Sequence, residues 1–290
     1  MNQKNTISTL VYIIIFLSVL STSLGIFYQD GGSSYLLESI RGQSIPIHGR
    51  GLYKHMSSEV AIQGIAQDYI TLFLGIPLLF FSLIGSRKGS LKGLFLLTGT
   101  LGYFFVTYLF YTTMGMYNFL FLAYVALLCT SFFAFITAIL SFELDTLELS
   151  FTPTTPFSTT AIFLIIVSFS IALLWLGIIV PPLLNGTIYP TGLEHYTTLI
   201  VQGLDLGLLL PGAVVSAVLL LQRRPLGILL TTTYIIFLSL MMTALSAKIT
   251  AMMMQGYEVF PAIIIIPIFN VLTLVALIFL LKNINEIKPL

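Results

Sequence analysis

Long apolar runs separated by short polar segments make up most of the chain. Each run is close to the roughly 20 residues that a helix needs to cross about 30 Å of hydrocarbon. The pattern therefore predicts an all-α fold, a polytopic transmembrane helical bundle of about eight membrane helices. The predicted spans are Ser8–Tyr28, Asp68–Gly85, Gly89–Tyr111, Tyr117–Ser141, Thr159–Leu183, Thr198–Leu221, Leu226–Ala247 and Phe260–Leu281.

The basic residues orient these helices. The first apolar run is longer than the core of a signal peptide, so we expect a retained helix. An even number of spans then places both chain ends on one side, and the positive-inside rule favours the cytoplasm (N-in, C-in). The basic residues predicted inside are Lys4, Arg87, Lys88, Lys92, Arg223, Arg224, Lys282 and Lys288. Those predicted outside are Arg41, Arg50, Lys54 and Lys248.

The composition excludes several classes of protein. Hydrophobic residues make up 57% of the chain and charged residues 8%, with a mean hydropathy of +1.03, so the chain cannot cover a water-facing surface. A net charge of +1 provides no field that would attract nucleic acid. A single cysteine, Cys129, excludes a disulfide framework and a thiolate zinc site. The sequence also has no phosphate-binding loop, dinucleotide fingerprint or hydrolase nucleophile motif.

Landmarks that recur in the same order predict two tandem four-helix repeats, residues 1–150 and 151–290. A segment from histidine to Gln-Gly occurs twice, at 55–64 and at 195–203, and an aspartate follows each copy. Each aspartate precedes a helix that contains a proline and ends at a basic turn. The first repeat has a long outer loop, residues 29–67, and a Pro/Thr-rich linker at 151–158 joins the two halves. Such parallel repeats occur in some transporters and place a cavity at the seam between the halves.

The aspartates of the two repeats, Asp68 and Asp205, are the strongest candidates for a binding site. A rise of 1.5 Å per residue to the basic turn places each carboxylate near the outer boundary of the hydrocarbon. One interpretation is an acid in the first turn of a helix, which the helix dipole favours. The other is a pair of carboxylates that line an outer vestibule and hold a cation or a proton.

Other polar side chains fall near the two aspartates in the sequence. The amides of Gln63, Gln67 and Gln202 either orient a ligand or bond neighbouring helices, and Tyr103 and Tyr108 face either a cavity or the membrane interface. His55 and His195 lie on the outer side, without the spacing of a metal motif. We therefore predict no metal site and no cofactor.

The predicted spans and the turns between them contain several short motifs. They are QDYITL at 67–72, GIPLL at 75–79, GSLKG at 89–93, Gly102-Tyr103, YNFLFLAYV at 117–125 and LDLGLLLP at 204–211. With them the chain resembles a family of uncharacterised bacterial multi-span integral membrane proteins with about eight helices. The resemblance is most specific from the second to the fourth predicted span. It implies a location in the cell inner membrane and implies no activity.

Three functional hypotheses follow. The preferred one is a small-molecule or ion transporter with its site between two pseudo-symmetric halves. The alternatives are an enzyme in or on the membrane that acts on lipid, and a sensor or assembly subunit without turnover. The expected partners are the lipid bilayer and a small-molecule or ion ligand, and no nucleic acid is expected.

Overall fold

The computed structural model describes residues 3–286, and 73% of the chain is helical. Within this described part, eight helical segments are long and apolar enough to cross a membrane. They indicate a multi-pass integral membrane protein. The predicted spans match these segments, but the second begins at Ser58, ten residues before its predicted start.

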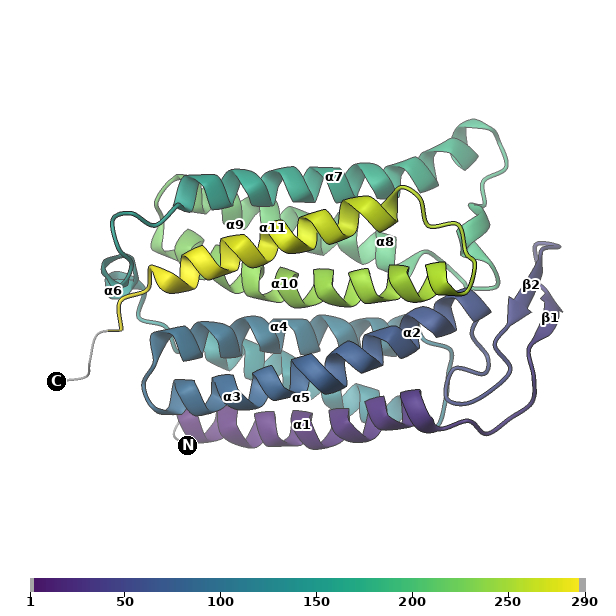
Figure 1. The fold of residues 1–290 in the computed structure, drawn as a ribbon, viewed down its shortest axis with the longest axis horizontal. Helices are drawn as coiled ribbons and strands as arrows, with labels where there is room; N and C mark the ends of the chain where they lie inside the picture. Colours follow the sequence, from purple (N-terminus) through teal and green to yellow (C-terminus); the bar gives the residue numbers. More distant parts are fainter. Residues whose placement is uncertain (1–2, 287–290) are drawn as a thin grey trace.

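The first four spans form one half of the molecule (Figure 1). They are α1 (Gln3–Phe27), a composite helix of α2 (Ser58–Ile70), a π-helix (Thr71–Gly75) and α3 (Ile76–Arg87), then α4 (Leu91–Thr113) and α5 (Phe121–Ile139). α1 begins and α11 ends at the same end of the bundle (Figure 1). We call it the inner end, following the orientation predicted from the basic residues.

The last four spans form the other half. They are α7 (Phe157–Leu184), a composite of α8 (Ile200–Leu204), a π-helix (Asp205–Leu209) and α9 (Leu210–Leu221), then α10 (Pro225–Met254) and α11 (Ala262–Lys282). Each half thus contains one span that is interrupted by a five-residue π-helix.

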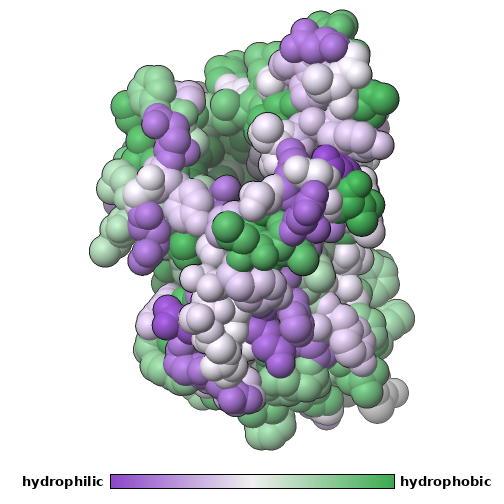
Figure 2. Space-filling view, turned by 90° about the vertical axis from the view of Figure 1, so that its right-hand side faces the viewer, coloured by the Kyte–Doolittle hydropathy of each residue, from purple (hydrophilic) through white to green (hydrophobic). Residues whose placement is uncertain are grey.

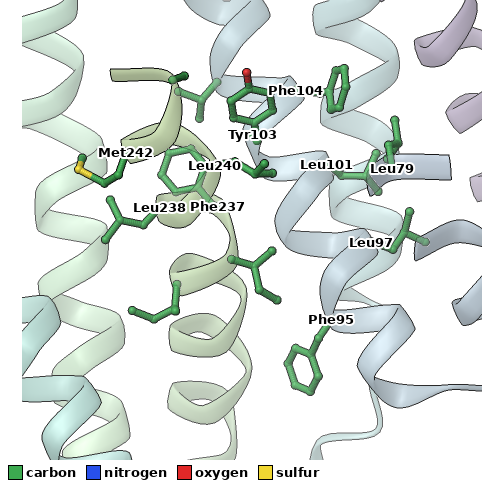
Figure 3. Close-up of a cluster of buried hydrophobic side chains, with 14 of the residues drawn as sticks. Leu79, Phe95, Leu97, Leu101, Tyr103, Phe104, Phe237, Leu238, Leu240 and Met242 are labelled. Carbon is green, nitrogen blue, oxygen red and sulfur yellow. The ribbon is translucent and has the colours of Figure 1, made fainter. Parts of the chain in front are cut away.

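α4 and α10 are the central helices, because each packs against its own half and against the other. Apolar side chains fill the space around them, among them Leu101 and Phe104 of α4 and Phe237 and Leu240 of α10 (Figure 3). A glycine lets the two backbones approach closely: a Cβ on Gly99 would lie 2.4 Å from the Cβ of Ile236. Small residues at helix contacts are typical of membrane bundles, where packing drives association.

The outer segment before α2 is shorter and more ordered than the predicted loop 29–67. The Ser57 side chain caps α2 by accepting a hydrogen bond from the Val60 amide, so the loop ends there. Within it, β1 (Tyr35–Glu38) pairs antiparallel with β2 (Ser44–Ile47). This hairpin is regular structure that the sequence did not predict, and buried Ile45 and Ile47 hold it in place.

The inner end is closed by the linker and the C-terminal segment. After α6 (Leu144–Leu147) and a 3₁₀ turn (Glu148–Ser150), Phe151 pairs with Ile284 in an antiparallel bridge. The Glu286 carboxylate accepts hydrogen bonds from Ser90 and from the first amides of α4. Negative charge at a helix N-terminus is favoured by the helix dipole. Lys288, counted above as an inner basic residue, lies outside the described residues.

The tight inner turns generate a first prediction. A Cβ on Gly93 would lie 2.6 Å from the Gly85 carbonyl carbon, and one on Gly227 would lie 2.3 Å from the Leu219 carbonyl carbon. Gly93→Ala and Gly227→Ala should each lower the free energy of unfolding by about 1–3 kcal/mol, because backbone must move to admit the methyl group. Thermal unfolding of the purified variants in detergent measures this loss.

The control is Gly212→Ala, because nothing lies within 4 Å of a Cβ at this position of α9. It should leave the unfolding temperature unchanged or raise it slightly, since alanine favours a helix by up to about 1 kcal/mol over glycine. Equal unfolding temperatures for all three variants would contradict the close backbone contacts at Gly93 and Gly227.

Candidate functional site

Asp68 lies in the middle of the composite span that starts with α2, with only 3% of its surface exposed. The Tyr53 hydroxyl donates a hydrogen bond of 2.5 Å to Oδ2, and the Tyr111 hydroxyl donates one of 2.9 Å to Oδ1. Because α2 begins ten residues earlier, at Ser58, the interpretation of Asp68 as a first-turn acid is wrong. The carboxylate is instead held inside the first half by two phenols.

Two glycines make room for this arrangement. A Cβ on Gly25 of α1 would lie 1.8 Å from the Asp68 carboxylate, and one on Gly64 would lie 3.1 Å from the Tyr53 ring. Burial, together with the negative charge of Asp68, raises the pKa of Tyr53 well above its ordinary value. Tyr53 therefore keeps its proton and remains a hydrogen-bond donor to the carboxylate.

An amide network lies next to Asp68. Gln67 Nε2 donates to the Tyr103 hydroxyl at 2.7 Å, and the hydroxyls of Tyr103 and Thr71 are 2.8 Å apart. Thr71 in turn donates to the backbone carbonyl of Gln67 at 2.9 Å. Gln67 Oε1 is buried without a hydrogen-bond partner in the described part of the chain. An unpaired buried acceptor is costly, and such atoms are common where a protein binds something polar.

Asp205 lies in the corresponding composite span of the second half, about one turn further along than Asp68, and has different surroundings. It is the first residue of its π-helix and is half-buried, and Trp175 Nε1 of α7 donates a hydrogen bond of 2.8 Å to Oδ2. Nothing lies within 4 Å of a Cβ on Gly177, two residues beyond this tryptophan. The second carboxylate therefore has one donor where the first has two.

The two halves also differ in packing. α1 packs closely on α5 in the first half, whereas α7 packs on α9 and barely touches α11 in the second. Figure 2 shows the outer end of the molecule face on, with an apolar-walled hollow in its upper part, over the second half. Asp68 is buried, whereas Asp205 is half-buried.

Lys248 of α10 connects the two sites. Its charge interacts with those of both Asp205 and Asp68, so one ammonium lies within electrostatic range of a carboxylate from each half. The residue is half-buried and lies six positions before the outer end of its helix. We call Asp68, Asp205 and Lys248 the charged triad.

Contacts between the halves cover the outer end above the triad. Arg41, in the turn between β1 and β2, donates to the backbone carbonyl of Glu194 at 3.0 Å and lies 5.2 Å above the ring of Tyr189. The Ser57 amide donates to the Tyr196 hydroxyl at 3.3 Å. These contacts, the outer clasp, join the hairpin of the first half to the 187–196 loop of the second.

The structure brings some of the predicted site residues together and leaves others apart. Asp68 and Asp205 belong to the triad, and Gln67 and Tyr103 form the adjacent network. The Tyr108 hydroxyl is also buried and without a partner among the described residues. Gln63 and Gln202 are half-buried, and their side chains make no hydrogen bond in residues 3–286.

The two histidines lie away from the carboxylates, in the outer clasp. His195 Nε2 is 3.1 Å from the backbone carbonyl of His55, whose own side chain is exposed. In the part of the chain that the structure describes, no three His, Cys, Asp or Glu side chains are placed to hold a metal ion. The arrangement thus offers carboxylates, phenols and one ammonium for binding.

Sequence reasoning missed four members of the site. Lys248 is among the basic residues predicted outside, directly after the predicted seventh span, and its spacing does not link it to the aspartates. Tyr111 ends the predicted third span, and Trp175 is the single tryptophan of the chain. Nothing in the sequence indicates that Tyr53 reaches back onto Asp68 from outside the spans.

Comparison of the chain with protein-family models, curated proteins and solved structures found no match. The resemblance to bacterial multi-span membrane proteins therefore stays a prediction.

Gly25 and Gly177 provide a matched pair of substitutions. Gly25→Ala should lower the free energy of unfolding by about 1–3 kcal/mol, because the new methyl group displaces the Asp68 carboxylate from its donors. Gly177→Ala should be neutral, because its Cβ meets open space. In thermal unfolding, replacing Asp68 with alanine as well should recover part of the loss, since it removes the clash. Strictly additive losses would contradict the contact.

Glu194 gives the outer clasp a pH dependence. Burial raises the pKa of Glu194 above its usual 4.5, and a hydrogen bond with Ser57 opposes the shift. A carboxyl group whose pKa rises on folding stabilises the protein while protonated, and this contribution is lost as the pH rises through the folded-state pKa. Glu194→Gln should therefore be more stable than the wild type at pH 7 and equally stable at pH 4.

Thermal unfolding of both proteins across this pH range measures the difference. The control is Glu258→Gln, since Glu258 is an exposed acid on another outer loop. A Glu194→Gln curve parallel to that of the wild type at every pH would contradict the assignment.

Proposed function

We propose that the protein is a transporter for an ion or a small cationic molecule, with its binding site at the charged triad between the two halves. The observation that carries the proposal is the placement of one lysine so that its charge interacts with a carboxylate from each half. Ionisable groups at membrane depth are expensive and typically mark ion or substrate pathways.

A count of charges indicates what the triad binds. Two carboxylates and one ammonium leave one negative charge uncompensated when all three groups are ionised. An uncompensated charge in a low-dielectric region is strongly unfavourable, so the triad gains stability by taking up one positive charge. A proton, a metal cation or an organic ammonium group meets this requirement.

Internal duplication supports a site at a seam. The segments 71–93 and 205–227 correspond in register: a five-residue π-helix, a 12-residue helix with proline at its second position, and a turn residue with positive φ, Gly89 or Arg223. A glycine then occupies the third position of the next helix, Gly93 or Gly227. We infer two tandem four-helix repeats with both ends in the cytoplasm, the parallel arrangement that some transporters share.

The π-helices favour a binding site whose geometry can change. π-helical turns are rare, and they are frequent at functional sites. One directly follows the helix segment of Asp68 and the other begins with Asp205. The Tyr234 hydroxyl donates to the carbonyl of Leu209 in the second π-helix at 3.0 Å. A shift of either π-helix would move its aspartate relative to Lys248.

The alternative functions have less support from the geometry. A lipid-acting enzyme would need a general base or a metal within reach of its substrate. His55 and His195 lie in the outer clasp, where one is exposed and the other contacts a backbone carbonyl. No contact in the described part of the chain specifically favours a sensor or assembly subunit.

Charge substitutions in proteoliposomes test the proposal. Steps in pH or in Na⁺ concentration should produce a saturable charge movement, recorded on a solid-supported membrane. Asp205→Asn leaves the triad neutral and should weaken the apparent cation affinity by about tenfold or more. Lys248→Gln leaves two negative charges and should strengthen the affinity by a similar factor.

The matched control is Asp145→Asn, which removes an exposed acid at the inner end and should change nothing. Opposite shifts for the two triad variants distinguish charge compensation from general damage, which would weaken both. Absence of charge movement in folded wild-type protein, or shifts of the same sign, would refute the proposal.

A further inference from the structure

A second feature, independent of the triad, is a cavity of about 970 Å³ between the outer ends of α2 and α10. The two helices pack side by side along the seam and both end beneath the hairpin segment (Figure 1). The residues on either side of the hairpin cover the cavity at its outer end, so it lies where the seam meets the outer membrane surface.

The cavity lining changes from polar to apolar along the helix axes. Ser33, Ser34, His48, Arg50 and Ser58 lie at the outer end, whereas Ile62, Ile65, Ala66, Ala247 and Ala251 follow further in. From Ser58 to Tyr69, the innermost lining residue of α2, a rise of 1.5 Å per residue gives about 16 Å. That is close to one leaflet, half of the roughly 30 Å hydrocarbon thickness.

The polar end of the cavity is positively charged. Its lining includes the Arg50 guanidinium and the His48 imidazole and contains no carboxylate. Glu59 and Glu194 lie near Tyr257 at the rim and do not line the cavity. The Arg50 side chain makes no hydrogen bond or ion pair within residues 3–286, so all its donors are available to a ligand.

Electrostatic repulsion between Arg50 and protonated His48 also favours an anion at this end of the cavity. Burial, and then the charge of Arg50, lower the pKa of His48 below its ordinary value. An anion placed between the two side chains would offset the repulsion between their positive charges. Arginine binds phosphate through paired hydrogen bonds, and the serine hydroxyls can donate to further phosphate oxygens.

The geometry points to a binding site for one anionic phospholipid of the outer leaflet. Its phosphate lies against Arg50 and the serine hydroxyls, and an acyl chain runs inward along the α2–α10 groove. The inference follows from the length of the cavity, its change from polar to apolar and its positive charge. It does not depend on transport.

Native mass spectrometry of the full-length protein, delipidated in a neutral detergent and titrated with phosphatidylglycerol, tests the inference. The wild type should retain one lipid, and Arg50→Gln should bind it about tenfold more weakly. Ala251→Phe, which fills the apolar part of the cavity, should weaken binding by a similar factor. Lys54→Gln is the control, because it removes an exposed cation from the same outer segment without touching the cavity.

Two further probes separate the lipid from its parts. Glycerol 3-phosphate tests a site for a small anion, and diacylglycerol tests a purely apolar groove. Each should bind at least tenfold more weakly than phosphatidylglycerol if both halves of the lipid contribute. Equal binding of either probe, or equal lipid affinity in wild type, Arg50→Gln and Lys54→Gln, would overturn the inference. Unfolding temperatures in the neutral detergent verify that every variant is folded.

Discussion

A carboxylate inside a membrane protein has to find its hydrogen-bond donors and its counter-charge within the protein itself. Asp68 organises much of the first half for this reason. Gly25 opens the space on α1, Tyr53 returns from the outer segment and Tyr111 reaches across from α4, so that three separate parts of the chain converge on one side chain. Lys248 supplies the counter-charge from the other half.

The second half contains the same elements with looser surroundings. Asp205 has a single indole donor. α7 barely contacts α11, whereas α1 and α5 pack closely on each other. One half therefore buries its acid among two donors, while the other leaves its acid half-buried with one. The charge of Lys248 interacts with both acids, whose hydrogen-bond donors and burial differ.

Hydropathy was sufficient to predict the spans, because the cost of placing polar groups in hydrocarbon constrains every helix in the same way. It failed for the start of α2, where Ser58–Gln67 is too polar to look like a membrane segment yet continues the helix outward. The two aspartates could be found as isolated acids in apolar surroundings. Tyr53, Trp175 and Lys248 could not, because their roles depend on tertiary contacts rather than on spacing along one helix.

The pairing at the inner end determines how the halves could move against each other. Phe151, between the halves, pairs with Ile284, and Glu286 then binds the start of α4, so the segment after α11 is fastened to both the linker and the opposite half. At the outer end the clasp consists of a few side-chain contacts on loops. Should the halves move apart, this inner attachment would keep their inner ends together, and α2 would have to slide or separate from α10 along the seam.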